Sequence, residues 1–117
     1  MLVDTSVWID HFRRRDPTLS DLLEHGEVEC HPFIIGELSC GNLHPRAEIL
    51  VLLRDLPLIS AVEHDEALAF VDSHRLMGSG LGWLDVHLLA SARLSSTLLW
   101  TRDRRLAAVA RRLSLAP

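Results

Sequence analysis

Short apolar runs and longer amphipathic stretches alternate along this chain. The runs at 1–3 and 97–100 have the length and composition of buried strands, and 27–30 and 58–60 are two further strand candidates. Elsewhere apolar residues recur every three or four positions, which is the spacing of helices that bury one face. The predicted helices cover 6–14, 17–25, 33–40, 45–56, 63–77, 83–92 and 104–110. Strands that alternate with helices indicate an α/β chain built on a parallel sheet.

Local signals mark where several of these helices begin and end. Asp16 and Pro17 are a capping residue followed by proline at the first helical position, and Gly26 is a typical stop. Pro57 breaks the fourth predicted helix. The glycine-rich stretch 78–82 lacks the Lys-Ser/Thr of a phosphate-binding loop and does not match the dinucleotide-binding pattern. It therefore predicts only a flexible entry to the next helix.

Composition limits the class of protein. With 117 residues, of which 48% are apolar and 24% charged, the sequence predicts a single globular domain over 1–117. No apolar run approaches the ~18 residues of a membrane-spanning helix, and the first residues look like structure and not like a secretory leader. We therefore expect a cytoplasmic protein. Cys30 and Cys40 fit neither a metal-binding spacing nor a disulfide framework, so we expect two reduced, buried thiols.

The charge balance is acidic, and every basic residue other than histidine is arginine. A formal charge of −4 argues weakly against nucleic-acid binding, but four acids gathered in one metal site would account for the whole excess. Arginine is also the better residue for two-pronged contacts to phosphate. The run Arg13-Arg14-Arg15 either complements the end of a helix dipole or forms a phosphate-binding patch, and both interpretations stay open.

Four acidic residues stand beside apolar elements. Asp4 follows the first strand and Asp103 follows the last one, each just before a helix. Glu37 stands alone on an apolar helix, and Asp85 lies in the first turn of another. Ordinary structural interpretations exist: Asp4 can cap a helix, Asp85 can face the positive end of a helix dipole, and Glu37 can sit at an exposed helix edge.

The positions of these acids also fit one shared site. The carboxyl ends of parallel strands lie at the same edge of a sheet, where open α/β sheets bind their ligands, so Asp4 and Asp103 are expected to meet there. Converging carboxylates repel one another unless a cation or protons neutralise them. An all-oxygen ligand set suits Mg²⁺ or Mn²⁺ and not Zn²⁺. Such a site can activate water and stabilise an in-line displacement at phosphorus.

The order of four short motifs resembles that of a known family. The motifs are Leu2-Val3-Asp4-Thr5-Ser6, Gly36-Glu37-Leu38, Gly82-Trp83-Leu84-Asp85-Val86-His87-Leu88-Leu89-Ala90-Ser91-Ala92 and Leu99-Trp100-Thr101-Arg102-Asp103-Arg104-Arg105-Leu106. Over essentially the whole chain, this ordered set resembles PIN-domain ribonucleases and, more narrowly, the VapC toxins of bacterial type II toxin–antitoxin pairs. None of the four acidic positions departs from the family pattern.

The resemblance implies a three-layer α/β/α sandwich with a central, mainly parallel sheet and a Mg²⁺-dependent endoribonuclease site, with Mn²⁺ as the other candidate metal. The residues that it implies to be catalytic and to hold the metal are Asp4, Glu37, Asp85 and Asp103. Ser6 and Thr101 would hold these acids in place without binding the metal themselves. Water activated by the metal would attack the RNA phosphodiester in line and leave 3′-hydroxyl and 5′-phosphate ends.

The resemblance also implies partners. Such toxins are typically homodimers that cleave tRNA or rRNA, and a cognate VapB-like antitoxin holds them inactive by filling the cleft with its C-terminal segment. Arg102 and Arg104, which flank Asp103, are the first candidates for contacts to RNA phosphates. The alternative for these two arginines is that they are solvated residues at the start of a helix.

Two other functions fit parts of the sequence. A phosphatase of the haloacid-dehalogenase type would use Asp4 as its nucleophile, but it needs a second aspartate two positions on, where Ser6 stands. It also needs a lysine, and the chain has none. A non-catalytic module that only binds RNA or an antitoxin has no need of four intact acids. We therefore expect a metal-dependent endoribonuclease, with the non-catalytic module as the alternative.

Overall fold

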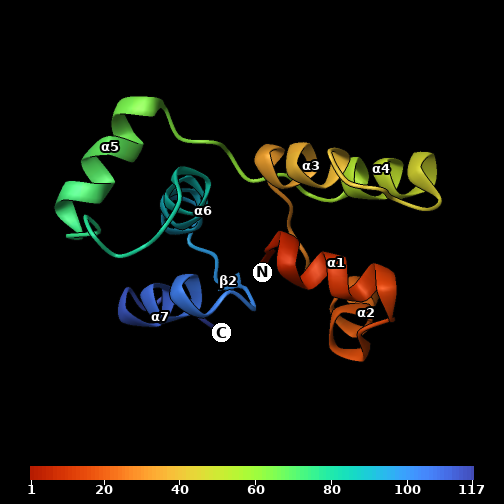
Figure 1. Cartoon of the computed structure of the whole chain (residues 1–117). Helices are drawn as coiled ribbons and strands as arrows, with labels where there is room; N and C mark the ends of the chain where they lie inside the picture. Colours follow the sequence, from red (N-terminus) through yellow and green to blue (C-terminus); the bar gives the residue numbers. More distant parts are fainter.

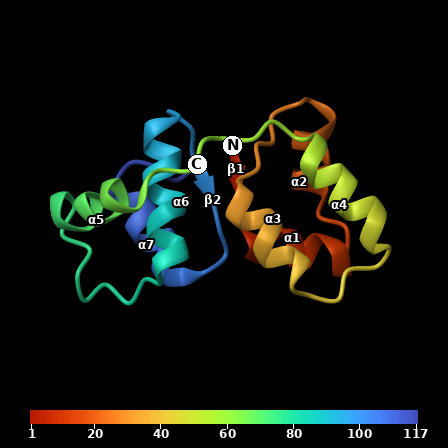
Figure 2. The same cartoon turned by 90° about the horizontal axis from the view of Figure 1, so that it is seen from above.

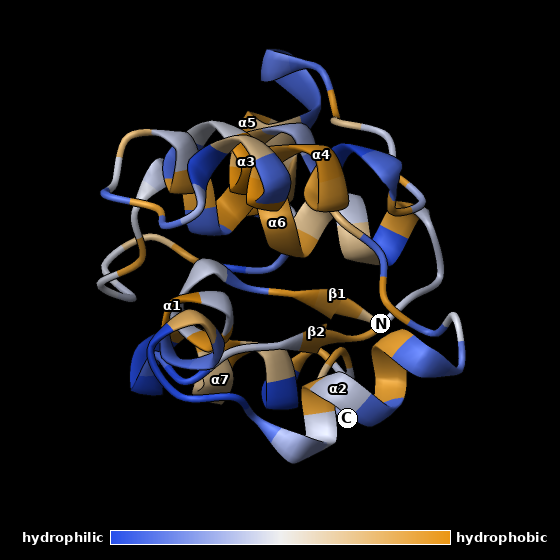
Figure 3. Cartoon of the chain, turned by 90° about the vertical axis from the view of Figure 1, so that its right-hand side faces the viewer, coloured by the Kyte–Doolittle hydropathy of each residue, from blue (hydrophilic) through white to orange (hydrophobic).

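The computed structural model describes all 117 residues and contains two short strands and seven helices. The elements are β1 Leu2–Val3, α1 Thr5–Arg13, α2 Pro17–Glu24, α3 Pro32–Ser39, α4 Arg46–Asp55, α5 His64–Ser73, α6 Trp83–Leu94, β2 Leu99–Trp100 and α7 Arg104–Arg112. They form three layers, with α3, α4, α5 and α6 on one side of the strands and α1, α2 and α7 on the other (Figure 3). The predicted α/β/α sandwich is confirmed.

The sheet is short and parallel throughout. Its paired residues, in order across the sheet, are Trp100 with Val3, Leu99 with Leu2, Leu2 with Glu29, and Cys30 with Leu58. The predicted strand 27–30 thus contributes two bridging residues, Glu29 and Cys30, and 58–60 contributes one, Leu58, so neither forms a regular strand. Because all these segments run in the same direction, the chain leaves each of them at the same edge of the sheet.

Helix α5 is shorter than its apolar spacing predicts, since it ends at Ser73 and not at Met77. Arg75 takes a positive φ of 53°, which closes the helix. The chain then turns back, and the N–H of Leu76 donates a hydrogen bond to the carbonyl of Val71 at 2.9 Å. The early end lets Leu76 enter the core, where it is buried.

Helix α6 lies at the centre of the molecule. Every residue from Val86 to Ala92 is buried, because the sheet covers one side of the helix and α5 packs against another (Figure 1). Burial of apolar side chains makes the largest favourable contribution to the free energy of folding. Although α6 is largely apolar, neither it nor any other helix of the chain is long and apolar enough to cross a membrane.

The two cysteines lie in different environments, and both are free thiols. Cys30 is buried within the sheet, as predicted, and burial raises the pKa of its thiol to about 11. The prediction of burial is wrong for Cys40, which is exposed. Cys40 follows the last residue of α3, beyond the turns with which that helix contacts the core.

Candidate functional site

The four acidic residues come from four elements that meet at one end of the molecule. Asp4 directly follows β1, and Asp103 directly precedes α7. Glu37 lies in the last turn of α3, and Asp85 lies in the first turn of α6. In Figure 2, β2 leads toward the side on which α6 and α7 begin and α3 ends. This side is the carboxyl edge of the parallel sheet, which is where open α/β folds bind ligands.

Asp4 is the buried member of this set, with 7% of its surface exposed. Its Oδ2 accepts hydrogen bonds from the hydroxyls of Ser6 at 2.8 Å and Thr101 at 2.7 Å. Ser6 Oγ accepts the backbone N–H of Arg102 at 3.0 Å, and Thr101 Oγ1 accepts that of Asp103 at 3.1 Å. The two hydroxyl residues thus connect the start of α1 to the loop between β2 and α7, and they fix the Asp4 carboxylate between them.

Asp85 and Asp103 each bind a backbone N–H at the start of their own helix. Asp85 Oδ2 accepts the N–H of Gly82 at 3.2 Å, and Asp103 Oδ1 accepts that of Leu106 at 3.0 Å. Carboxylates at these positions also favour the positive end of the helix dipole. The capping role leaves Asp85 Oδ1 and Asp103 Oδ2 without a hydrogen-bond partner, so each residue keeps an oxygen for a second role.

Asp85 is close enough to the other three acids for their charges to act on it. The pKa of Asp85 is raised by burial and by the charges of Asp4, Asp103 and Glu37, against the lowering effect of the Gly82 N–H. As the side chains stand, no three acidic, imidazole or thiol groups are close enough to hold a metal ion. Repulsion between charges reaches further than a coordination bond, so the four residues form a loose set, which we call the acid cluster. A cation would have to draw them closer.

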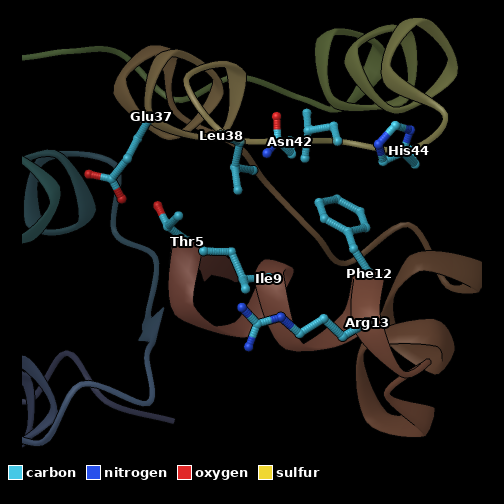
Figure 4. A pocket seen from close by; sticks show the side chains of 10 residues that line it. Thr5, Ile9, Phe12, Arg13, Glu37, Leu38, Asn42 and His44 are labelled. Atoms are coloured by element: carbon cyan, nitrogen blue, oxygen red, sulfur yellow. The ribbon is translucent and has the colours of Figure 1, made fainter.

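Glu37 is exposed, and it lines one end of a groove between α1 and the segment from α3 to α4 (Figure 4). The groove has a volume of about 590 Å³. Its polar and aromatic lining consists of Thr5, Phe12 and Arg13 from α1 and of Glu37, Asn42 and His44 from the opposite side. Glu37 is therefore at an exposed helix edge, as the structural interpretation proposes, but this edge opens onto a groove that starts at the acid cluster.

The two arginines predicted to contact RNA differ in their surroundings. The guanidinium of Arg102 binds the carboxylates of Asp10, at 2.8 Å, and Asp16. These two hydrogen bonds are also the largest causes that raise its pKa. Arg104 is exposed and makes no hydrogen bond or ion pair through its side chain. Of the two, only Arg104 can meet a phosphate without breaking an ion pair.

Aromatic contacts join the helices that carry Glu37 and Asp85. The ring of His87 on α6 lies 5.0 Å from that of Phe33 on α3 and 4.9 Å from that of Trp83, in edge-to-face geometry in both cases. Such contacts add to the stability of the packing between two helices. They help to set how far α3 stands from α6, and so how far Glu37 stands from Asp85.

The part of α1 that faces the groove was not predicted from the sequence. Thr5, Ile9, Phe12 and Arg13 are spaced by four, three and one positions, which places them on one helix face, and this spacing is the signal that could have found them. Within the arginine run, only Arg13 lines the groove. The structure therefore separates one member of the run from its neighbours.

The sequence matches known proteins over nearly its whole length. The family model described as PIN domain matches residues 1–112. Two sequences named Ribonuclease VapC32, from Mycobacterium tuberculosis strains CDC 1551 / Oshkosh and ATCC 25618 / H37Rv, are each 48% identical over 109 residues, covering 92% of this chain and 88% of theirs. The crystal structure of PAE2754 from Pyrobaculum aerophilum matches with a TM-score of 0.67 at 18% identity, covering 92% of this chain and 82% of that one. At this identity, the likeness shows the fold alone.

Proposed function

Because this chain belongs to the PIN-domain family, we propose that it is a metal-dependent endoribonuclease and the toxin of a VapC-type toxin–antitoxin pair. Two relatives at 48% identity carry the name ribonuclease. The observation that carries the proposal is the acid cluster, in which the charges of Asp4, Asp103 and Glu37 all act on Asp85 at the carboxyl edge of the sheet. A fold gains no stability from such repulsion, so the cluster points to a ligand that relieves it.

The chemistry of the donors indicates which cation fits. All four candidate ligands are carboxylates, and the cluster includes no thiol and no imidazole, so a hard ion such as Mg²⁺, or Mn²⁺ as the alternative, suits it better than Zn²⁺. The residues that would hold the cation are Asp4, Glu37, Asp85 and Asp103. A bound cation of this kind supplies two effects: it activates water, and it offsets the charge that develops on the phosphate.

The remaining residues of the site position the acids and the substrate. Ser6 and Thr101 keep the Asp4 carboxylate in one orientation through their two short hydrogen bonds. Arg104, which is free and lies beside Asp103, would contact an RNA phosphate. Attack in line with the leaving oxygen would leave 3′-hydroxyl and 5′-phosphate ends on the products.

The same site offers a place for an inhibitor. An acidic cluster that is exposed at Glu37 and half-buried at Asp85 attracts a basic segment, so we propose that a VapB-like antitoxin brings an arginine or a lysine to it and competes with the cation. We also propose that the chain forms a homodimer. Val51 and Leu52 of α4 are exposed and offer apolar surface for that contact.

Cleavage of RNA by the purified chain tests the proposal. The protein is incubated with tRNA and with rRNA in Mg²⁺ and in EDTA, and each acid is replaced singly by its amide. We expect cleavage only with the metal, and a loss of about a hundredfold or more in each variant. Glu66→Gln is the matched control, because Glu66 also accepts an N–H at the start of a helix but lies outside the cluster.

The alternative function predicts a different result. A non-catalytic module would bind RNA or the antitoxin and leave RNA intact under all of these conditions. Cleavage that survives EDTA, or that all four amide variants retain, would contradict the proposed mechanism.

A further inference from the structure

A second, smaller pocket lies between α5, the start of α6 and the loop 74–82 that joins these two helices. It has a volume of about 330 Å³. Figure 2 shows the loop reaching the side on which α6 and α7 begin. Gly82 lines the pocket, and its N–H donates a hydrogen bond to Asp85 Oδ2 at 3.2 Å. The pocket is therefore within one helical turn of a member of the acid cluster.

The side chains that line this pocket carry no charge. Leu68, Met77 and Trp83 form part of its walls, and all three are large apolar residues that are exposed to solvent. The one polar side chain is that of Ser79, whose hydroxyl already donates to the carbonyl of Leu76. A charged group would find no partner of opposite sign inside the pocket. The lining therefore favours a neutral and largely apolar ligand group.

The loop adds polar groups to the pocket through its backbone. Gly78, Gly80 and Leu81 all line the pocket, and their N–H groups donate no hydrogen bond within the chain. The carbonyls of the same three residues accept none. An aliphatic side chain in the pocket would cover such groups and leave them unpaired, which is unfavourable. A planar heterocycle with donors and acceptors along its edge would pair with them.

Trp83 gives the pocket a flat surface that is held in position. Its ring meets that of His87 edge to face at 4.9 Å, and that of His64 at 5.3 Å. The residue is nevertheless 40% exposed, so part of the indole is open to a ligand. Nucleobases stack on aromatic rings of this kind with little dependence on sequence. Because two neighbours already order the ring, stacking on it costs little side-chain entropy.

Arg105 brings a positive charge to the same loop. Its side chain lies across Gly80, where an added Cβ would be 3.0 Å from both its Cδ and its Nη1. Gly80 also has a φ of 82°, so the backbone conformation and the close approach of Arg105 both favour glycine. The guanidinium itself makes no hydrogen bond and no ion pair. It is therefore free to bind the phosphate of a nucleotide whose base lies in the pocket.

We propose that this pocket binds one unstacked nucleobase of the RNA, close to the bond cut at the acid cluster. The base would stack on Trp83 and pair its edge with the backbone of the loop, and its phosphate would meet Arg105. The inference rests on the proposed function, since it takes RNA as the substrate. It adds a determinant of specificity, because the enzyme would favour cleavage sites at which a base can leave its stack.

An apolar side chain of a protein partner is the other occupant that fits the size and lining of the pocket. The loop and the charge favour a nucleotide. A leucine or phenylalanine has no group that pairs with the backbone of Gly78, Gly80 or Leu81. A segment that also neutralises the acid cluster needs to be basic, and Arg105 would repel it. An RNA strand is attracted by the same guanidinium.

Equilibrium binding of a short single-stranded RNA of mixed sequence, measured by fluorescence anisotropy in EDTA, tests the pocket without cleavage. We expect Trp83→Leu to weaken binding about tenfold, and Trp83→Phe about threefold or less, because the smaller ring still stacks. Neither variant should change the slope of log K against log salt, since stacking releases no counterion. Thermal melts of both variants establish that folded proteins are compared. If Trp83→Leu does not fold, Trp83→Phe takes its place in the experiments below.

Arg105→Gln tests the phosphate contact. It should weaken binding about threefold to tenfold and reduce the salt slope by about 0.7, the value for one phosphate of a single strand. The matched control is Arg111→Gln, which removes the same charge from the same helix at an exposed position outside the pocket. It should change binding by less than about twofold, as a distant screened charge does. Equal effects of the two substitutions would contradict the contact.

A scan that places a single abasic site at each position of the RNA in turn locates the base. Wild type should lose about tenfold in affinity at one position, and Trp83→Leu should be insensitive at that position alone. A purely structural role of Trp83 would weaken binding to all of these RNAs equally and would overturn the pocket. So would a Trp83→Leu variant that binds RNA like wild type but loses affinity for the antitoxin, because the occupant is then a protein side chain.

Two controls separate the source of the base and the two proposals. Free nucleoside monophosphates should displace the RNA only at much higher concentrations, and displacement at the concentration of the RNA itself would make this a free-nucleotide site and overturn the assignment to RNA. If the abasic pattern holds while wild type cuts no RNA in Mg²⁺, the proposed function fails and the pocket stands. If wild type cuts RNA but shows no such pattern, the pocket fails and the proposed function stands.

Discussion

Replacing Asp85 by asparagine separates the two roles that the structure gives this residue. The Asp85 carboxylate accepts the Gly82 N–H at the start of α6, which stabilises the helix, and it is also repelled by three other acids, which destabilises the fold. Asparagine has nearly the same shape and removes the charge. We expect the metal-free variant to be as stable as wild type or more so, because the raised pKa of Asp85 means that its folded surroundings disfavour the charge.

The size of each effect can be bounded. A carboxylate at a helix start is worth about 0.3–1 kcal/mol through the dipole, and the variant loses this. Burial and the three neighbouring acids outweigh the stabilising hydrogen bond from the Gly82 N–H, as the direction of the pKa shift shows. Since the pKa is raised from its ordinary 3.8, the penalty is absent at low pH and grows as the pH rises through and above that value. Asp85→Asn should remove this part of the pH dependence.

A bound metal ion should make wild type, and not Asp85→Asn, the protein that gains more stability. A cation that binds the folded state at a hundredfold excess over its dissociation constant stabilises it by about 2.7 kcal/mol, which for a domain of this size is a rise in melting temperature on the order of 10 °C. Wild type should therefore gain more from Mg²⁺ than Asp85→Asn gains. Thermal melts with and without Mg²⁺ measure both shifts in one experiment.

Glu66→Gln supplies the matched comparison for these melts. Glu66 accepts the N–H of Glu63 at 3.1 Å from the third position of α5, just as Asp85 accepts that of Gly82 from the third position of α6. Without metal, Glu66→Gln should lose about 0.3–1 kcal/mol, and its response to Mg²⁺ should equal that of wild type. Equal responses of wild type and Asp85→Asn to Mg²⁺ would refute the assignment of Asp85 to a metal site.

Three further predictions use single residues. Arg102→Gln should lower stability by about 1 kcal/mol or less, because its two ion pairs are partly exposed, and it should leave the salt dependence of RNA binding unchanged, whereas Arg104→Gln should flatten it. Iodoacetamide at pH 8 should label exposed Cys40 in the folded protein and spare Cys30, whose pKa is about 11; mass spectrometry counts the labels. Burial lowers the pKa of His31 from 6.5 to about 4, so about 3 kcal/mol of stability should be lost as the pH falls between these values, and urea midpoints against pH measure it.

The helix starts could be predicted because their causes are local. Asp16 caps α2 by accepting the Leu19 N–H at 2.9 Å, three residues away, so both partners are visible in one short stretch of sequence. The strands were harder, since a strand is defined by a partner elsewhere in the chain. Glu29 meets the sheet through a single bridge to Leu2, and nothing near Glu29 reveals that the pairing stops there.

The acids of the site could be selected from sequence because each stands beside an apolar element, but their surroundings could not. The partners of Arg102 are Asp10 and Asp16, more than eighty residues earlier in the chain. No local pattern around Arg102 distinguishes it from Arg104, which stays free. The sequence therefore predicted an RNA contact for both arginines, although their surroundings in the folded protein differ.

Asp4 and Thr5 show how one end of a strand serves two purposes. The charge of Asp4 is buried, and the fold supplies two hydroxyl donors to the same oxygen, one of them from a segment 97 residues away. Thr5, the next residue, is equally buried, yet the fold supplies nothing to its hydroxyl. Had the segment evolved only to start α1, valine or alanine at this position would avoid the cost of the unpaired group. The fold therefore satisfies the carboxylate at the end of β1 and leaves the neighbouring hydroxyl unpaired.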